Sequence, residues 1–257
     1  MIVLLVDDVA VACEGKLVVE YAKLLLHKGD VALLIGPNGS GKSSLLNAIA
    51  GHPRYKIVKG KVMLFGKDVT ETPPHKRIEM GIGIAVQNPP RLKGVKLRAL
   101  LENVLKKRGI SEVDNEVRRI AKLLSIEHLL DREYGFGFSG GELKRAEMAL
   151  LVAQAPRIAL IDEPDSGVDV DSVMVIASAI EELMCSGTEA MLIVTHSGLI
   201  ARHIKCSRIY VMLDKKIVLE SSRFEILNEV LSKGFSWIKR GDVYIEGKDT
   251  RVSPKGN

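Results

Sequence analysis

A glycine-rich segment has the residue types and the spacing needed to hold a chain of phosphates. Residues 36–43 fit the pattern G-x-x-x-x-G-K-[ST]. Its glycines let the backbone curl so that several N–H groups face one anion, while Lys42 can reach the β- and γ-phosphates and the Ser43 hydroxyl can ligate Mg²⁺. The predicted nucleotide-binding residues are Gly36, Pro37, Asn38, Gly39, Ser40, Gly41, Lys42, Ser43 and the adjoining Ser44.

The flanking residues predict the elements that would position this loop. Residues 31–35 are all apolar, as expected of a parallel strand that is buried on both faces. Residues 44–50 predict a helix, and Gly51 can cap its C-terminus. The phosphates would then lie at a helix N-terminus, where the helix dipole favours negative charge.

Two acids follow a second apolar run, residues 158–161. A buried strand that ends in Asp162 and Glu163 is costly unless the carboxylates have a role there. Beside a phosphate loop, Asp162 can hold Mg²⁺ and Glu163 can polarise a water molecule for attack on the γ-phosphate. The simpler alternative is an acidic pair at the start of an exposed loop.

The segment Ser139-Gly140-Gly141-Glu142 allows two interpretations. Ser139 and Glu142 fit a helix capping box, which needs no ligand. The two glycines between them weaken the helix, however, and bare N–H groups at a helix start can bind an anion. From these residues alone, a cap and a ligand site are equally supported.

Two single polar residues follow apolar runs of strand character. Gln87 comes after residues 81–86, and a lone glutamine on a loop is usually only a surface residue. His196 comes shortly after residues 191–194, and a lone histidine is more often structural than functional.

Composition sets limits on the function. The 257 residues are 46% hydrophobic, enough for one large α/β domain. The net charge of +5 is spread over dispersed basic residues, which favours a solvated surface over a nucleic-acid patch. Cys13, Cys185 and Cys206 form no C-x-x-C motif, which argues against a disulfide framework and suits a reducing cytoplasm. No apolar run approaches the roughly 18 residues of a membrane span.

Other patterns divide the chain. Alternation predicts β-hairpins that turn near residues 14–15 and 214–215. Between about 90 and 150 the spacing becomes that of amphipathic helices, one of them capped by Ser111. The residues after 239 are rich in Gly, Lys, Asp and Ser, and we expect them to be loosely held.

The order of these features resembles the ABC-type ATPase domain over about residues 1–240. That resemblance turns the weak signals into roles. It implies three catalytic residues: the general base Glu163, the switch histidine His196 and Gln87. It implies further nucleotide contacts from the signature motif and the D-loop, namely Ser139, Gly140, Gly141 and Asp169. It implies metal binding by Ser43, Gln87 and Asp162.

The resemblance also implies a fold and a mode of action. The expected fold is α/β, a P-loop NTPase with a parallel-sheet core, an antiparallel β subdomain and a helical lobe. We expect a single domain over 1–240, with the RecA-like core at about 1–88 and 151–240, the lobe at about 89–150 and a flexible tail at 241–257. The cofactors would be ATP and Mg²⁺. Two subunits would associate transiently, head to tail, with each ATP between one phosphate loop and the other subunit's signature helix.

Several segments are similar, within that family, to the ATPase subunits of the Suf iron–sulfur cluster assembly machinery; they are residues 52–55, 87–90, 138–145, 165–171 and 234–238. The implied partners are soluble SufB/SufD-like scaffold proteins in the cytoplasm, which would contact Gln87 and residues 88–110. ATP-driven dimerisation would rearrange that scaffold, and the chain itself would carry no cluster.

Two other functions stay open at this point. One is the cytoplasmic ATPase subunit of an ABC membrane importer, since Pro164 is common in such subunits. The other is a nucleic-acid clamp, but clamps of this family need a long coiled-coil insert, and only residues 44–138 separate the phosphate loop from the signature. We therefore expect no nucleic-acid partner and no direct membrane insertion.

One departure from the family pattern concerns the base. No aromatic residue precedes Tyr21, so adenine would rest on aliphatic side chains such as Val11 or Val18. We accordingly expect poor base selectivity, with GTP competing measurably against ATP.

Overall fold

The computed structural model describes residues 1–222, 225–236, 238 and 244–245. Nearly all of the tail expected to be flexible, residues 241–257, lies outside this range, as does Trp237 of the Suf-like segment. In the part that is described, no helix combines the length and the apolar character required to cross a membrane.

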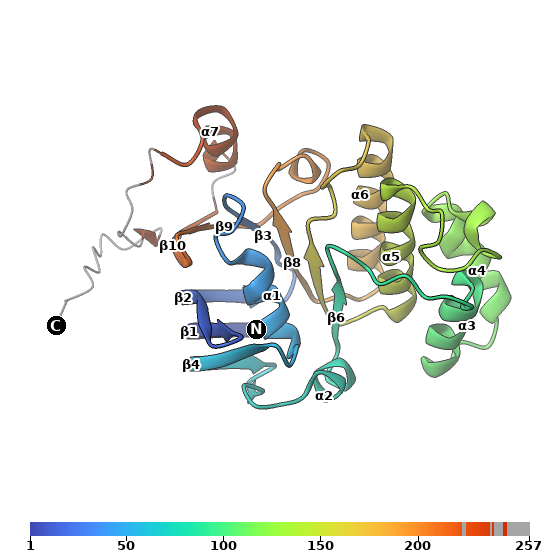
Figure 1. Ribbon diagram of the computed structural model, residues 1–257, viewed down its shortest axis with the longest axis horizontal. Helices are drawn as coiled ribbons and strands as arrows, with labels where there is room; N and C mark the ends of the chain where they lie inside the picture. The colour runs from blue at the N-terminus through green and yellow to red at the C-terminus, as the bar shows by residue number, and fades with distance from the viewer. Residues whose placement is uncertain (223–224, 237, 239–243, 246–257) are drawn as a thin grey trace.

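A mixed β-sheet of 11 strands, counted over the described residues, runs through the molecule (Figure 1). The strand order is β5-β4-β1-β2-β10-β9-β3-β8-β7-β6, with β11 paired to β10. The strands are β1 (Ile2–Cys13), β2 (Lys16–His27), β3 (Val31–Ile35), β4 (Tyr55–Leu64), β5 (Lys67–Asp68), β6 (Ile82–Ala85), β7 (Ile158–Asp162), β8 (Ala190–Thr195), β9 (Arg208–Leu213), β10 (Lys216–Ser221) and β11 (Tyr244–Ile245).

The sheet has two parts with different strand directions. Strands β9, β3, β8, β7 and β6 are parallel, whereas β1, β2, β4 and β5 pair antiparallel. The predicted parallel core and antiparallel subdomain are thus confirmed. Both predicted hairpins are present: Cys13 pairs with Lys16, and Leu213 pairs with Lys216.

Both faces of the parallel part are buried, which explains why its strands are apolar throughout. In β3, Leu33 and Ile35 belong to the cluster under α5 and α6, while Ala32 and Leu34 belong to the cluster under α1. Because successive side chains of a strand point to opposite faces, one five-residue strand supports both layers.

The helices are α1 (Lys42–Ala50), α2 (Pro74–Glu79), α3 (Leu97–Lys107), α4 (Val113–Leu123), α5 (Gly140–Gln154), α6 (Val170–Cys185) and α7 (Glu225–Lys233). Figure 1 shows α3 and α4 at the end of the molecule far from β1, β2 and β4, with α5 and α6 between. The predicted cap of α4 is wrong: Glu112, not Ser111, occupies the N-cap, and no side chain bonds there. The expected boundary at 150/151 between lobe and core lies inside α5.

A buried arginine ties the C-terminus of α1 to the segment before α2. The Arg77 guanidinium donates to the carbonyl oxygens of Ala48, Ile49, Thr70 and Thr72 at 2.8–2.9 Å. The last carbonyls of a helix have no partner within the helix, so this side chain satisfies two of them. It thereby fixes the far end of the helix that starts at the phosphate loop.

We expect Arg77→Lys to lower the free energy of unfolding by about 2 kcal/mol, since one ammonium group cannot reach four carbonyls and leaves buried acceptors unpaired. Urea denaturation followed by circular dichroism measures the change. Arg118→Lys, at an exposed site on α4, is the matched control. Equal unfolding midpoints for the two variants would show that Arg77 has no such structural role.

Candidate functional site

The glycine loop, residues 36–41, lies between β3 and α1, and two of its glycines are packed too closely to carry a side chain. A Cβ at Gly36 would collide with the carbonyl oxygen of Met212. Gly41 has a φ of 106°, and a Cβ there would lie 2.7 Å from the carbonyl oxygen of Val18. The predicted pattern therefore requires glycine at two positions. Gly36 is required for lack of space, and Gly41 is required for lack of space and for its positive φ.

Lys42 is buried at the start of α1. Its Nζ donates to the carbonyl oxygens of Gly36 at 2.8 Å and Pro37 at 2.9 Å. Burial lowers the pKa of this ammonium, while the charges of Glu163 and Asp162 act in the opposite direction. The positive charge is thus held inside the loop, close to both acids.

Ser43 and Asp162 form the predicted pair of oxygen ligands. The Ser43 hydroxyl donates to Oδ1 of Asp162 at 3.0 Å. Burial raises the pKa of Asp162 to about 6, and the bond from Ser43 opposes that shift. A cation at this position would remove much of the cost of the buried negative charge.

The donor set of the site fits Mg²⁺ better than a transition metal. Within the described part of the chain, no group of three or more His, Cys, Asp or Glu side chains could hold a metal ion. Mg²⁺ needs only one or two protein oxygens, because it keeps waters and takes phosphate oxygens. The hydroxyl and carboxylate of Ser43 and Asp162 meet that requirement.

Glu163 lies against the other two predicted catalytic residues, Gln87 and His196. Its buried carboxylate accepts from Nε2 of Gln87 at 2.6 Å and lies 3.3 Å from Nδ1 of His196. Its φ of 48° is unusual for a residue other than glycine, and its N–H is held by the carbonyl of Val194 at 2.9 Å. The ends of β6, β7 and β8 supply these three side chains.

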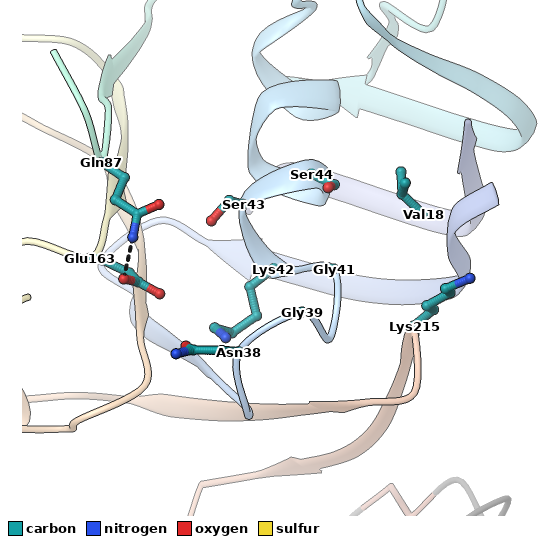
Figure 2. Close-up of a pocket in the computed structure, with 10 residues that line it drawn as sticks. All are labelled: Val18, Asn38, Gly39, Gly41, Lys42, Ser43, Ser44, Gln87, Glu163 and Lys215. Atoms are coloured by element: carbon teal, nitrogen blue, oxygen red, sulfur yellow. Dashed lines mark hydrogen bonds between the residues drawn. The ribbon is translucent and has the colours of Figure 1, made fainter. Parts of the chain in front are cut away.

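A cleft of about 340 Å³ adjoins the loop. Its lining residues are Val18, Asn38, Gly39, Gly41, Lys42, Ser43, Ser44, Gln87, Glu163 and Lys215. In Figure 2, Gln87 and Glu163 lie on one side of the loop, and Val18 and Lys215 lie on the other. Within the loop, the buried hydroxyl of Ser40 has no hydrogen-bond partner among the described residues.

The signature residues lie outside this cleft. Ser139 caps α5 in a complete capping box with Glu142, so the structural interpretation of these two residues is confirmed. Gly141 packs against α6, where a Cβ would be 2.6 Å from the Ser172 hydroxyl. Asp169 caps α6 through the N–H of Ser172 at 2.7 Å. The structure brings these residues near one another but not to the phosphate loop of the same chain.

Two side chains on α5 hold the end of β6, and sequence reasoning missed both. Lys144 donates to the carbonyl oxygen of Gln87 at 2.7 Å. Glu147 accepts from the N–H of Val86 at 3.1 Å and from the Tyr134 hydroxyl at 2.6 Å. Burial raises the pKa of Glu147 and lowers that of Lys144. The sequence did offer one signal: Lys144 and Glu147 are charged residues three positions apart in a helix that is otherwise largely apolar on its buried side.

Asp165 was also missed as an organising residue. Its buried carboxylate accepts from the hydroxyls of Thr195 at 2.9 Å and Ser197 at 2.6 Å, and from the N–H of Ile200 at 3.1 Å. These bonds fix the loop that carries His196. Val11, one of the residues expected under the base, is fully buried and does not line the cleft, whereas Val18 does.

Comparison with known proteins gives consistent matches. The family model described as ABC transporter matches residues 19–166. The probable ATP-dependent transporter ycf16 of Cyanidium caldarium is 35% identical over 227 residues, covering 84% of this chain and 89% of that protein. The probable ATP-dependent transporter SufC of Escherichia coli (strain K12) is 33% identical over 243 residues, covering 91% and 97%.

A solved structure agrees with these matches. It is described as the ADP conformation of an ATP-binding cassette of an ABC transporter. It shares 28% sequence identity and a TM-score of 0.73 with this chain, over 90% of this chain and 95% of the other.

We expect Asp165→Asn to loosen the loop around His196, because an amide cannot accept all the bonds that the carboxylate accepts. Hydrogen–deuterium exchange of peptides spanning residues 195–202 should become at least about tenfold faster. Asp171→Asn, at an exposed position on α6, is the control and should leave that exchange unchanged. Equal protection in both variants would contradict the role assigned to Asp165.

Proposed function

Since this chain belongs to the ABC transporter family of ATP-binding proteins and is an ATPase, we propose that it hydrolyses ATP in the cleft between the phosphate loop and Glu163. One observation carries this proposal. The Glu163 carboxylate, in contact with Gln87 and near His196, shares a cleft with Lys42 and Ser43. A base, a polar orienting group and a phosphate cradle are the parts that in-line attack on a γ-phosphate requires.

Each side chain has a distinct proposed task. Lys42 and the N–H groups of the loop neutralise the β- and γ-phosphates. Glu163 accepts a proton from the attacking water, which Gln87 helps to orient. His196, whose Nδ1 lies 3.3 Å from the Glu163 carboxylate, would contact the γ-phosphate. Mg²⁺, held by Ser43, Gln87 and Asp162, would neutralise charge that builds up on the phosphate oxygens.

The position of the signature supports a head-to-tail dimer. Ser139 and Gly140 are exposed at the start of α5 and do not line the cleft of their own chain. A second copy could place its signature, with Asp169 nearby, over the nucleotide of the first. We propose that ATP closes this dimer transiently and that hydrolysis releases it.

The proposed partner is the SufB/SufD-like scaffold of iron–sulfur cluster assembly. The Suf-like sequence segments and the match to SufC of Escherichia coli support it. The proposed contact involves Gln87 and residues 88–110, next to the part of β6 that Lys144 and Glu147 connect to α5. Three free cysteines, Cys13, Cys185 and Cys206, are consistent with the cytoplasm as the place of action.

We expect Glu163→Gln to lower ATP turnover at least about 100-fold while ATP binding remains, because the amide cannot accept the proton. The variant should form a dimer when ATP is added. Phosphate release and light scattering measure the two effects. Glu112→Gln, at an exposed position, is the control. A turnover rate equal to that of the unmodified protein would overturn the assignment of Glu163. A second variant, Lys42→Ala, should abolish nucleotide binding.

The partner is tested by purifying Glu163→Gln from its native cells in the presence of ATP. We expect a soluble co-purifying protein that contains iron and acid-labile sulfide. Recovery of a membrane-spanning permease would instead identify the chain as the ATPase subunit of an importer. That second outcome has some support, because the relatives are described as probable transporters.

A further inference from the structure

The cleft has two chemically different ends. The proposed hydrolysis uses one of them, and Val18 and Lys215 lie at the other. Gln87 and Glu163 lie at the end where hydrolysis is proposed, with the loop in the middle (Figure 2). If the γ-phosphate faces Glu163, the nucleoside must extend past Gly41 toward Val18 and Lys215. This step rests on the proposed function.

Lys215 is held firmly at this end. It forms the tip of the β9–β10 hairpin with Asp214, and both residues have positive φ, 66° and 44°. Its carbonyl oxygen accepts from the N–H groups of Glu20 at 2.8 Å and Tyr21 at 3.3 Å. Met212 on the same hairpin packs against the phosphate loop. The backbone of Lys215 is therefore fixed relative to both β2 and the loop.

The ammonium group of Lys215 is available to a ligand. Over the part of the chain that the structure describes, it has no hydrogen-bond acceptor and no carboxylate partner. Its neighbour Lys216, by contrast, pairs with Glu20 at 3.3 Å. Among the described residues, the cleft lining contains no aromatic side chain, and Val18 supplies the apolar contact at this end. Polar contacts must then supply most of the base recognition.

We propose that Lys215 is a specificity-determining residue that donates hydrogen bonds to the purine base and raises the affinity for GTP relative to ATP. An ammonium group only donates. Guanine presents two adjacent acceptors, O6 and N7, whereas adenine presents the acceptor N7 beside the donor N6 amino group. Lys215 therefore matches guanine at both atoms and adenine at one.

The test is the ratio of the dissociation constants of MgATP and MgGTP, measured by isothermal titration calorimetry. Lys215→Ala should weaken GTP binding about tenfold relative to ATP binding. Lys215→Gln should shift the ratio further toward ATP, because an amide can pair with N6 and N7 of adenine. Lys216→Ala, one residue along the same hairpin, is the matched control and should leave the ratio as it is.

An unchanged ratio of the two dissociation constants in both Lys215 variants overturns the proposal. An equal loss of affinity for ATP and GTP also overturns it, because Lys215 would then contact the phosphates or the ribose rather than the base. These outcomes differ from failure of the proposed function. In that case the unmodified protein would bind neither nucleotide, and Lys42→Ala would have no binding to remove.

Discussion

Parallel strands that are buried on both faces end at one edge of the sheet, and this edge carries the charged and polar groups of the candidate site. The packing of the surrounding helices holds those groups in place. Strands β3, β8, β7 and β6 are adjacent and parallel. Their carboxyl ends lead into the phosphate loop, His196, the Asp162–Glu163 pair and Gln87. Burying charge there is costly, since burial raises the pKa of Asp162 to about 6, and the nearby ammonium groups of Lys144 and Lys42 offset part of that shift.

Rigid contacts to this edge come from both sides of the sheet. On one side, Arg77 holds the far end of α1, so the helix that follows the loop cannot shift independently. On the other, α5 is bonded to the end of β6 through Lys144 and Glu147. Hydrogen bonds thus connect α5 to the carbonyl oxygen of Gln87, and the Gln87 side chain donates to Glu163 at 2.6 Å. These contacts form a continuous hydrogen-bonded connection between α5 and Glu163.

The sequence predicted the elements well where local patterns determine them. The phosphate loop, the strand that ends in Asp162 and the capping box at Ser139 depend on neighbours in the chain, and the structure has each of them. Asp165 and Glu147 could not be found in this way, because Thr195 is 30 residues from Asp165 and Val86 is 61 residues from Glu147, and only folding brings them together.

The two valines expected under the base show the same limit. Val11 pairs with Val19 across the β1–β2 hairpin, and both are buried. Val18, one residue earlier on β2, is only partly buried and lines the cleft. The apolar pattern identified both candidates, but it could not show which of them borders the cleft.

The direction of α5 explains why Ser139 and Gly140 do not line the cleft of their own chain. Gln154 bonds to the carbonyl of Ile82 at the start of β6, and Glu147 bonds to the N–H of Val86 just after the strand ends. The helix thus runs antiparallel to the strand, and its first residues project past the carboxyl edge of the sheet. At 1.5 Å per residue, Ser139 lies about 12 Å beyond the turn of α5 that contacts Val86. The exposed N-terminus of α5 therefore lies beyond the sheet edge, which is the position that the proposed head-to-tail dimer requires.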